Sequence, residues 1–134
     1  MRTRMSVPVF CFAALALASG GLAAAPSLSP QSSSVSGVTV KATPRAVSGD
    51  TWEFEIVMDT HSQNLSDDLT KAAVLSAGNG ISYTPTGWQG DPPGGHHRKV
   101  ILRFKAPKPG SKAIELRIHR PGEASARTFR WQLE

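Results

Sequence analysis

The sequence predicts an all-β domain built as an antiparallel sandwich, and three observations support this prediction. Seven short segments alternate apolar with polar residues, which is the period of a strand buried on one face. Turn-forming residues separate these segments, among them Asn79-Gly80 and the Pro107–Gly110 stretch. No segment after residue 37 has the sustained 3.6-residue period of an amphipathic helix. Seven strands with such turns are typical of the immunoglobulin-like sandwich.

The first two predicted strands begin the folded part of the chain. Residues 38–44 alternate valine and alanine with threonine and lysine, and Pro44 ends this strand because it lacks an amide donor. In residues 52–58, four large apolar side chains from Trp52 to Met58 occupy alternate positions. Period two places all four on one face of a sheet, whereas a helix would scatter them around its axis. We therefore expect Trp52 near the centre of the core.

The middle of the chain predicts a polar loop followed by a hairpin. Residues 60–71 are polar, with one short helical turn expected at Ser66–Leu69 and capped by Ser66. Residues 72–75 predict a short buried strand. Asn79-Gly80 predicts a tight turn to the strand of residues 81–84, because a type I′ turn needs positive φ at both central residues.

Three strands complete the predicted sandwich, in residues 99–105, 114–119 and 128–133. Burial of one large apolar side chain contributes about 1.5–3 kcal/mol. The inward-facing set can therefore offset the entropy cost of ordering the chain. The expected core consists of Val40, Trp52, Phe54, Ile56, Met58, Val74, Leu75, Val100, Leu102, Phe104, Ile114, Leu116, Ile118, Phe129 and Trp131.

The first 25 residues predict a signal peptide that is removed on export. Arg2 and Arg4 precede an apolar run from Val7 to Ala18, and small residues at Ala23–Ala25 offer a cleavage site. The apolar run is too short to span a bilayer, although a retained N-terminal anchor is the alternative. The Ser- and Pro-containing residues 26–37 predict a flexible tether, and the domain is expected to span residues 38–134.

Charge and cysteine usage narrow the class of protein. The only cysteine, Cys11, lies in the signal segment, so the exported domain is expected to fold without a disulfide. The formal charge falls from +5 to +3 without Arg2 and Arg4, and the remaining charges of both signs are interspersed, which does not favour a nucleic-acid partner. No later apolar stretch is long enough for a membrane span. We expect a periplasmic or secreted protein.

Strand order predicts which loops meet. If successive strands alternate in direction, the loops Thr60–Lys71, Pro85–Arg98 and Arg120–Arg127 lie at one end of the sandwich. The Pro85–Arg98 segment is rich in Gly and Pro, so it is expected to be a loop and not an inner strand. All four histidines of the chain lie in or beside these loops: His61, His96, His97 and His119.

The histidines at this end predict a transition-metal site. On a Gly-Gly loop, His96 and His97 can turn toward one ion, and His61 would complete a three-imidazole site for Cu²⁺ or Zn²⁺. Asp59, Asp67, Asp68 or Asp91 would add an oxygen ligand. The alternative is that the imidazoles only fasten the loops, because the sequence has no spacing diagnostic of a metal site.

Two other side chains at this end have either a binding or a structural role. Trp88 would stack on a partner or cover the open end of the sandwich, and we favour the cover. Arg98 is expected to pair with the carboxylate of Asp67 or Asp68. Ser62 beside His61 predicts a turn and not a nucleophile, because adjacent residues do not supply the geometry that a nucleophile and its base need. We therefore expect no enzymatic activity.

The basic residues of the later strands are expected on solvated sheet faces, where Glu115 and Glu123 interrupt the positive charge. They are Arg103, Lys105, Arg117, Arg127 and Arg130.

Several motifs together resemble those of small secreted or periplasmic bacterial β-sandwich proteins. They are Trp52-x-Phe-x-Ile-x-Met-Asp-Thr-His-Ser, Trp88-x-Gly, Gly-Gly-His-His-Arg and Phe129-Arg-Trp131. The resemblance implies that the Thr-His-Ser and Gly-Gly-His-His-Arg segments belong to one unit, and it carries no activity with it. The expected function is an exported cell-envelope binding module, with copper or zinc at the histidine-lined end. A structural or protein-interaction domain is the alternative.

Overall fold

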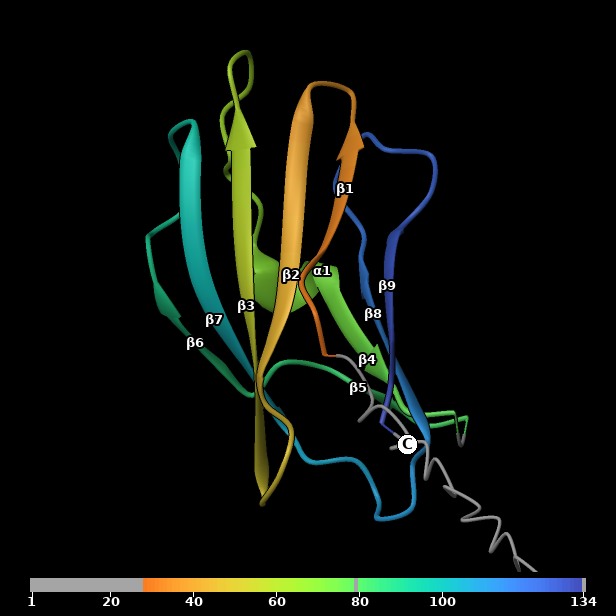
Figure 1. Cartoon of the computed structure of the whole chain (residues 1–134). Coiled ribbons are helices and arrows are strands. Elements are labelled where there is room, and N and C mark those ends of the chain that lie inside the picture. Colours follow the sequence, from red (N-terminus) through yellow and green to blue (C-terminus); the bar gives the residue numbers. More distant parts are fainter. Residues whose placement is uncertain (1–27, 79, 134) are drawn as a thin grey trace, which may run out of the picture.

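A computed structural model describes residues 28–78 and 80–133 of the chain, which form two antiparallel β-sheets (Figure 1). The predicted signal peptide lies outside the described residues. The first sheet contains, in spatial order, β1 (Gln31–Val35), β2 (Val38–Ala46), β3 (Thr51–Thr60), β7 (His97–Lys105) and β6 (Gly87–Gly90). The second contains β5 (Ser82–Tyr83), β4 (Ala73–Ser76), β8 (Ala113–Ile118) and β9 (Arg127–Gln132). The prediction of an all-β structure with two antiparallel sheets is confirmed.

The described strands number nine, so the prediction of seven is wrong by two, β1 and β6. β1 forms within the predicted tether and pairs with β2, from Gln31 opposite Ala42 to Val35 opposite Val38. Its serines give no apolar alternation, because β1 is an edge strand with little buried surface. Likewise, β6 is a four-residue edge strand inside the predicted Gly- and Pro-rich loop. Both strands therefore lack the hydrophobic period that identifies a half-buried strand.

The core lies between the two sheets and largely matches the predicted set. Of the fifteen predicted core residues, fourteen are buried, and Val74 is half-buried on β4. Phe54 occupies the centre, since its ring lies 5.7 Å from the rings of both Phe104 and Trp131. Trp52, expected at the centre, is 8% exposed near the beginning of β3. The aromatic centre thus lies one inward position further along the same strand.

The only helix in the described part of the chain is α1 (Leu69–Ala72), one turn that precedes β4. Asp68 caps it by accepting a hydrogen bond from the Thr70 amide at 3.1 Å, so the expected cap at Ser66 is wrong. Buried Leu65 and Leu69 anchor this segment to the core. No helix among the described residues has the length and apolar character needed to cross a bilayer.

Gly90, at the end of β6, gives a stability prediction. Its φ is 131°, and a Cβ there would lie 2.4 Å from the Lys99 carbonyl oxygen on β7. We expect Gly90→Ala to lower the free energy of unfolding by about 1–3 kcal/mol, because it must displace backbone or remain strained. The matched control is Gly87→Ala on the same strand, where a Cβ meets no atom within 4 Å. Equal losses in urea unfolding of the two variants would contradict this reading.

Candidate functional site

Three loops meet at one end of the sandwich, as strand order predicts. The Thr60 amide donates to the His96 carbonyl at 2.9 Å, which joins the end of β3 to the start of β7. Two backbone hydrogen bonds join Leu65 to the β6–β7 loop. The Leu65 amide donates to the Gly95 carbonyl at 2.9 Å, and the Gly94 amide donates to the Leu65 carbonyl at 2.8 Å. The third loop, Arg120–Arg127, begins beside α1, because the preceding His119 amide donates to the Ala72 carbonyl at 2.9 Å. The prediction that these loops share an end is confirmed.

The imidazoles at this end point to solvent and do not form a ligand set. His61, His96 and His97 are all exposed. The Nδ1 atom of His97 lies 2.5 Å from the Asp59 carboxylate, a cross-strand pair on the outer face of the sheet. Within residues 28–78 and 80–133, no three or more His, Cys, Asp or Glu side chains are grouped to hold a metal ion. The Cu²⁺ or Zn²⁺ site therefore stays a prediction of the sequence.

Arg98 is buried and bonds backbone carbonyls, not the carboxylates that we expected. It is 2% exposed. Its Nη1 donates to the Asp67 carbonyl at 2.6 Å, and its Nε donates to the Asp91 carbonyl at 3.3 Å. Asp68 caps α1, and the Asp67 carboxylate accepts two hydrogen bonds from Arg120 instead. Arg98 thus holds two loops together without an ion pair among the described residues.

A buried ionic network continues from Asp67 across the loop end. The Asp67 carboxylate accepts from Nε and Nη2 of Arg120 at 2.8 and 3.1 Å. Arg120 also donates to Glu123 at 3.3 Å, and Glu123 accepts from Arg127 at 2.9 and 2.7 Å. Every side chain in this network is at most 7% exposed. The network links the Thr60–Lys71 and Arg120–Arg127 loops through charge-assisted hydrogen bonds, the strong class of such bonds.

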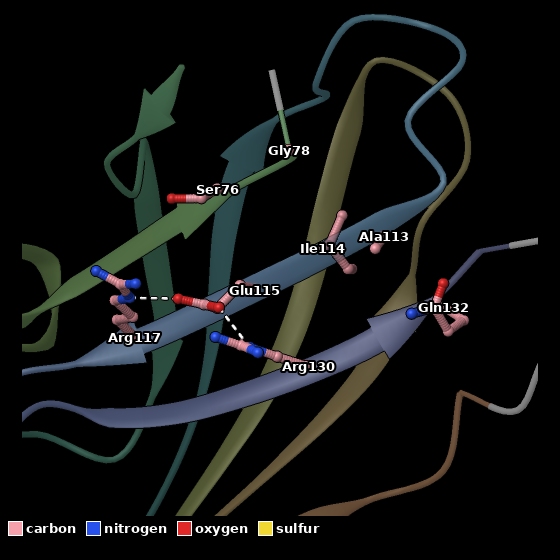
Figure 2. Close-up of a pocket in the computed structure, with 8 residues that line it drawn as sticks. All are labelled: Ser76, Gly78, Ala113, Ile114, Glu115, Arg117, Arg130 and Gln132. Carbon is pink, nitrogen blue, oxygen red and sulfur yellow. Dashed lines mark hydrogen bonds and ion pairs between the residues drawn. The ribbon is translucent and has the colours of Figure 1, made fainter. Parts of the chain in front are cut away.

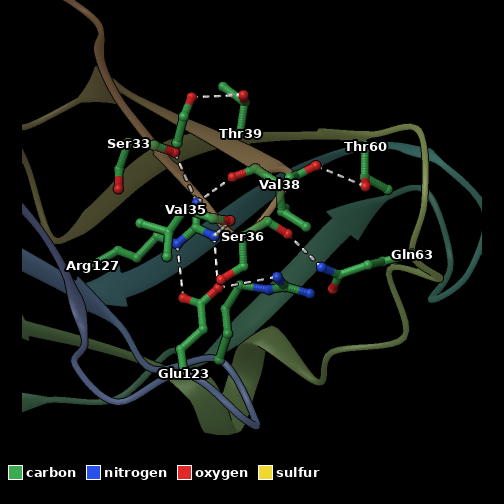
Figure 3. Close-up of polar contacts among 12 residues, drawn as sticks. Ser33, Val35, Ser36, Val38, Thr39, Thr60, Gln63, Glu123 and Arg127 are labelled. Atoms are coloured by element: carbon green, nitrogen blue, oxygen red, sulfur yellow. Dashed lines mark hydrogen bonds and ion pairs between the residues drawn. The ribbon is translucent and has the colours of Figure 1, made fainter.

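Arg127 has all five of its N–H donors in hydrogen bonds (Figure 3). Two go to Glu123, and three go to the carbonyls of Ser33, Val35 and Val38 at 2.8, 3.0 and 2.8 Å. The guanidinium therefore fastens the β1–β2 hairpin to β9 and to the loop that precedes it. This position contradicts the expectation that Arg127 lies on a solvated face.

The buried arginines had a sequence signal that our prediction did not use. Arg98 shares the parity of the inward residues of β7, and Arg120 shares the parity of those of β8. Arg127 likewise precedes Phe129 by two residues on β9. Period two extended beyond the last apolar residue places each guanidinium on the inner side of its sheet. Three arginines at inward-facing positions, all at the same end of the sandwich, predict a buried polar cluster there.

Glu123 makes the stability of this end depend on acid pH. Hydrogen bonds from Arg127, with the charges of Arg127 and Arg120, hold the pKa of Glu123 below its ordinary value of 4.5 even though burial opposes this. The stabilisation is therefore complete above pH 4.5 and is lost as the pH falls through the lower folded-state pKa. We expect Glu123→Gln to be less stable at pH 7 and to lose less stability between pH 5 and pH 3. Urea unfolding at each pH measures this difference, and parallel curves for the two proteins would contradict it.

A pocket of ≈190 Å³ lies beside the loop end, between β6, β7 and α1. Trp88 pairs with Leu102, whose side chain is buried, so register places the indole on the inner face of its sheet. Because β6 is an edge strand, Trp88 is still 43% exposed, and it lines the pocket beside the loop end. The pocket is lined by Asp68, Leu69, Thr70, Trp88, Pro93, Arg98 and Val100.

A second hollow, of ≈400 Å³, lies on the outer face of the four-stranded sheet (Figure 2). Arg117 and Arg130 extend over it, and both donate to Glu115 between them. More than half of each arginine side chain is exposed. Glu115 therefore reduces the positive charge of this face, which matches the expected solvated surface.

Comparisons with protein-family models, with curated proteins and with solved structures give no match to this chain. The loop end and the Trp88 pocket are therefore the features of the molecule that bear on its function.

Proposed function

We propose that this protein is a non-catalytic binding module of the bacterial cell envelope that holds a partner polypeptide at the Trp88 pocket and the adjoining edge of β6. The observation that carries the proposal is an exposed tryptophan on the edge strand of a described sheet, beside a pocket whose floor includes the buried Leu69, Arg98 and Val100. Tryptophan is enriched among the residues that dominate protein–protein affinity. This is the interaction-domain alternative of the sequence-based prediction.

The edge of β6 adds backbone groups to this surface. In Figure 1, β6 borders its sheet, and none of the described strands lies beyond it. An edge strand presents unpaired N–H and C=O groups, which can accept an added strand. A strand paired there places alternate side chains on the inner face, next to Trp88. Such peptide addition combines backbone bonds for affinity with pockets for specificity.

The opposite edge of the same sheet is closed. The side-chain amide of Gln31 at the start of β1 bonds both the amide and the carbonyl of Arg130 on β9. The Trp131 indole donates to the Ser29 carbonyl at 2.8 Å. These bonds join the two sheets on the β1 side, so β6 is the more accessible edge for a partner strand.

Peptide selection on the purified protein tests the proposal. We expect selected peptides to shift the backbone amide NMR signals of β6 and residues 91–97. Trp88→Ala should weaken their binding about tenfold or more, the effect of losing an interface anchor. The control is Val35→Ala, which removes an equally exposed side chain, also 43%, from the opposite edge strand. Shifts confined to another face, or unchanged affinity of Trp88→Ala, would refute the proposal.

Metal titration separates this proposal from a metal-binding module. We expect Zn²⁺ and Cu²⁺ to leave the melting temperature of the tag-free protein unchanged, because among the described residues the exposed imidazoles belong to no group of three or more possible ligands. The variant carrying His96→Ala and His97→Ala should melt the same way with and without metal. A metal-dependent rise that this variant loses would instead support the sequence-based metal site.

A further inference from the structure

We infer that Arg98 forms a carboxylate-binding subsite at the base of the Trp88 pocket, so that the bound partner presents a carboxylate on a short apolar stem. The inference rests on the proposed function and names the chemistry of its ligand. It begins from a difference among the three buried arginines. Arg120 and Arg127 each hold a carboxylate, whereas Arg98 has none within ion-pair distance among the described residues.

Arg98 also keeps donors that no residue described in the structure uses. Its Nε and Nη1 each donate to a backbone carbonyl, of Asp91 and of Asp67, and Nη2 has no hydrogen-bond partner there. No fully buried side-chain nitrogen in the described part of the chain lacks a hydrogen bond. The Nη2 group therefore keeps some exposed surface, and Arg98 lines the ≈190 Å³ pocket.

Burial makes the environment of this guanidinium unfavourable for its charge. Burial lowers the pKa of Arg98 from its ordinary value, and the charges of Asp67, Asp68 and Asp91 only partly oppose this. A carboxylate in the pocket would supply the missing countercharge. The planar guanidinium fork suits a carboxylate better than it suits a neutral acceptor, because charge-assisted bonds are roughly twice as strong.

Asp68 lines the same pocket, and its negative charge would repel a bound carboxylate. One of its oxygens, Oδ1, accepts from the amide and the hydroxyl of Thr70, and Lys71 lies 4.0 Å from the other. The Asp68 carboxylate is thus already partnered, and it is 53% exposed to screening by solvent. Arg98 remains the charge in the pocket wall that lacks an ion-pair partner. Leu69, Pro93 and Trp88 form an apolar wall beside it.

The pocket size limits the ligand to one side chain or a chain terminus. Two sources present this chemistry, the C-terminus of a peptide and an Asp or Glu side chain. N-acetyl-leucine imitates the first, and N-acetyl-glutamate α-amide imitates the second. The neutral control is N-acetyl-leucinamide, which matches the first probe in shape and lacks its charge.

NMR titration of the intact wild-type protein tests the inference without a mutation. We expect at least one carboxylate probe to shift the Arg98 side-chain Nε–H signal and the Trp88 indole signal, with affinity at least about fivefold above that of the amide, the ratio that about 1 kcal/mol supplies. The stronger of the two probes identifies the source. Equal binding of amide and acids, or shifts only around Arg117 and Arg130, would overturn the inference.

A variant separates the guanidinium fork from its charge. Arg98→Lys keeps the charge and loses the planar fork, so it should reduce the preference for acid over amide. If this variant unfolds, the wild-type titration still decides. Peptides that bind at Trp88 equally well with their carboxylates converted to amides would refute the subsite while leaving the binding function intact. If no selected peptide and no probe binds at Trp88 of the wild-type protein, both the subsite and the proposed binding function are refuted.

Discussion

Replacing Arg127 with lysine is expected to lower the free energy of unfolding by about 3–5 kcal/mol, because lysine keeps the charge that faces Glu123 but leaves at least two acceptors without a donor, at about 1–3 kcal/mol for each buried one. Lysine offers three donors on a point charge, whereas Arg127 uses five donors in a fixed plane. Glu123 and the hairpin carbonyls would lose donors at positions that are buried or partly buried. Urea unfolding monitored by tryptophan fluorescence measures the loss.

Arg130 provides the control for Arg127, three residues further along β9. Its side chain is 73% exposed and pairs with Glu115 on the outer face. Arg130→Lys should change the free energy of unfolding by less than about 0.5 kcal/mol, as for most exposed pairs. Equal effects of the two substitutions would show that burial of the Arg127 network does not stabilise this end.

Asp67→Asn is the second substitution expected to have a large effect, again about 3–5 kcal/mol. The asparagine keeps the shape of Asp67 but removes the charge that faces the buried Arg120 guanidinium. The neighbouring Asp68→Asn should be much milder, because Asp68 is exposed and asparagine is also a favourable helix cap. Thermal and urea unfolding of the two variants measure the free energy of unfolding that each loses. They thereby compare a buried carboxylate with an exposed one at the next position.

A compensating change distinguishes lost ion pairing from general disruption by Asp67→Asn. Adding Arg120→Met removes the unpaired charge and fills its space with an apolar side chain. The double variant should recover part of the lost stability, as apolar replacements of buried ion pairs often do. If instead the two losses add, Asp67 and Arg120 stabilise the fold independently, and the network interpretation fails.

The positions of these residues also explain how the proposed binding surface is held. Arg98, which lines the pocket, bonds the carbonyls of Asp67 and Asp91, and the Asp67 carboxylate is bonded in turn by Arg120. Three buried side chains, Leu69, Arg98 and Val100, therefore line the pocket beside its exposed residues. Preorganisation of this kind reduces the entropy cost of binding. Destabilising Asp67 is accordingly expected to weaken peptide binding at Trp88.

Alternation of apolar residues was enough to predict most of the fold. It located seven of the strands, nearly all of the core and the end at which the three loops meet, because a strand buried on one face must repeat every two residues. It did not locate β1 and β6, whose backbones pair at the sheet edges while their side chains remain largely outside the core. An edge strand is stabilised by its neighbour, so its own side chains carry little signal.

The candidate site divides in the same way. The sequence by itself determined that His61, His96, His97, Trp88 and Arg98 lie near one end, since this follows from strand parity. Only the tertiary structure decided that the imidazoles face solvent while the guanidiniums of Arg98, Arg120 and Arg127 lie inside. The reason is physical: a charged side chain can be buried only where distant segments supply its partners. Those partners, Asp67, Glu123 and the carbonyls of the β1–β2 hairpin, come together only in the folded chain.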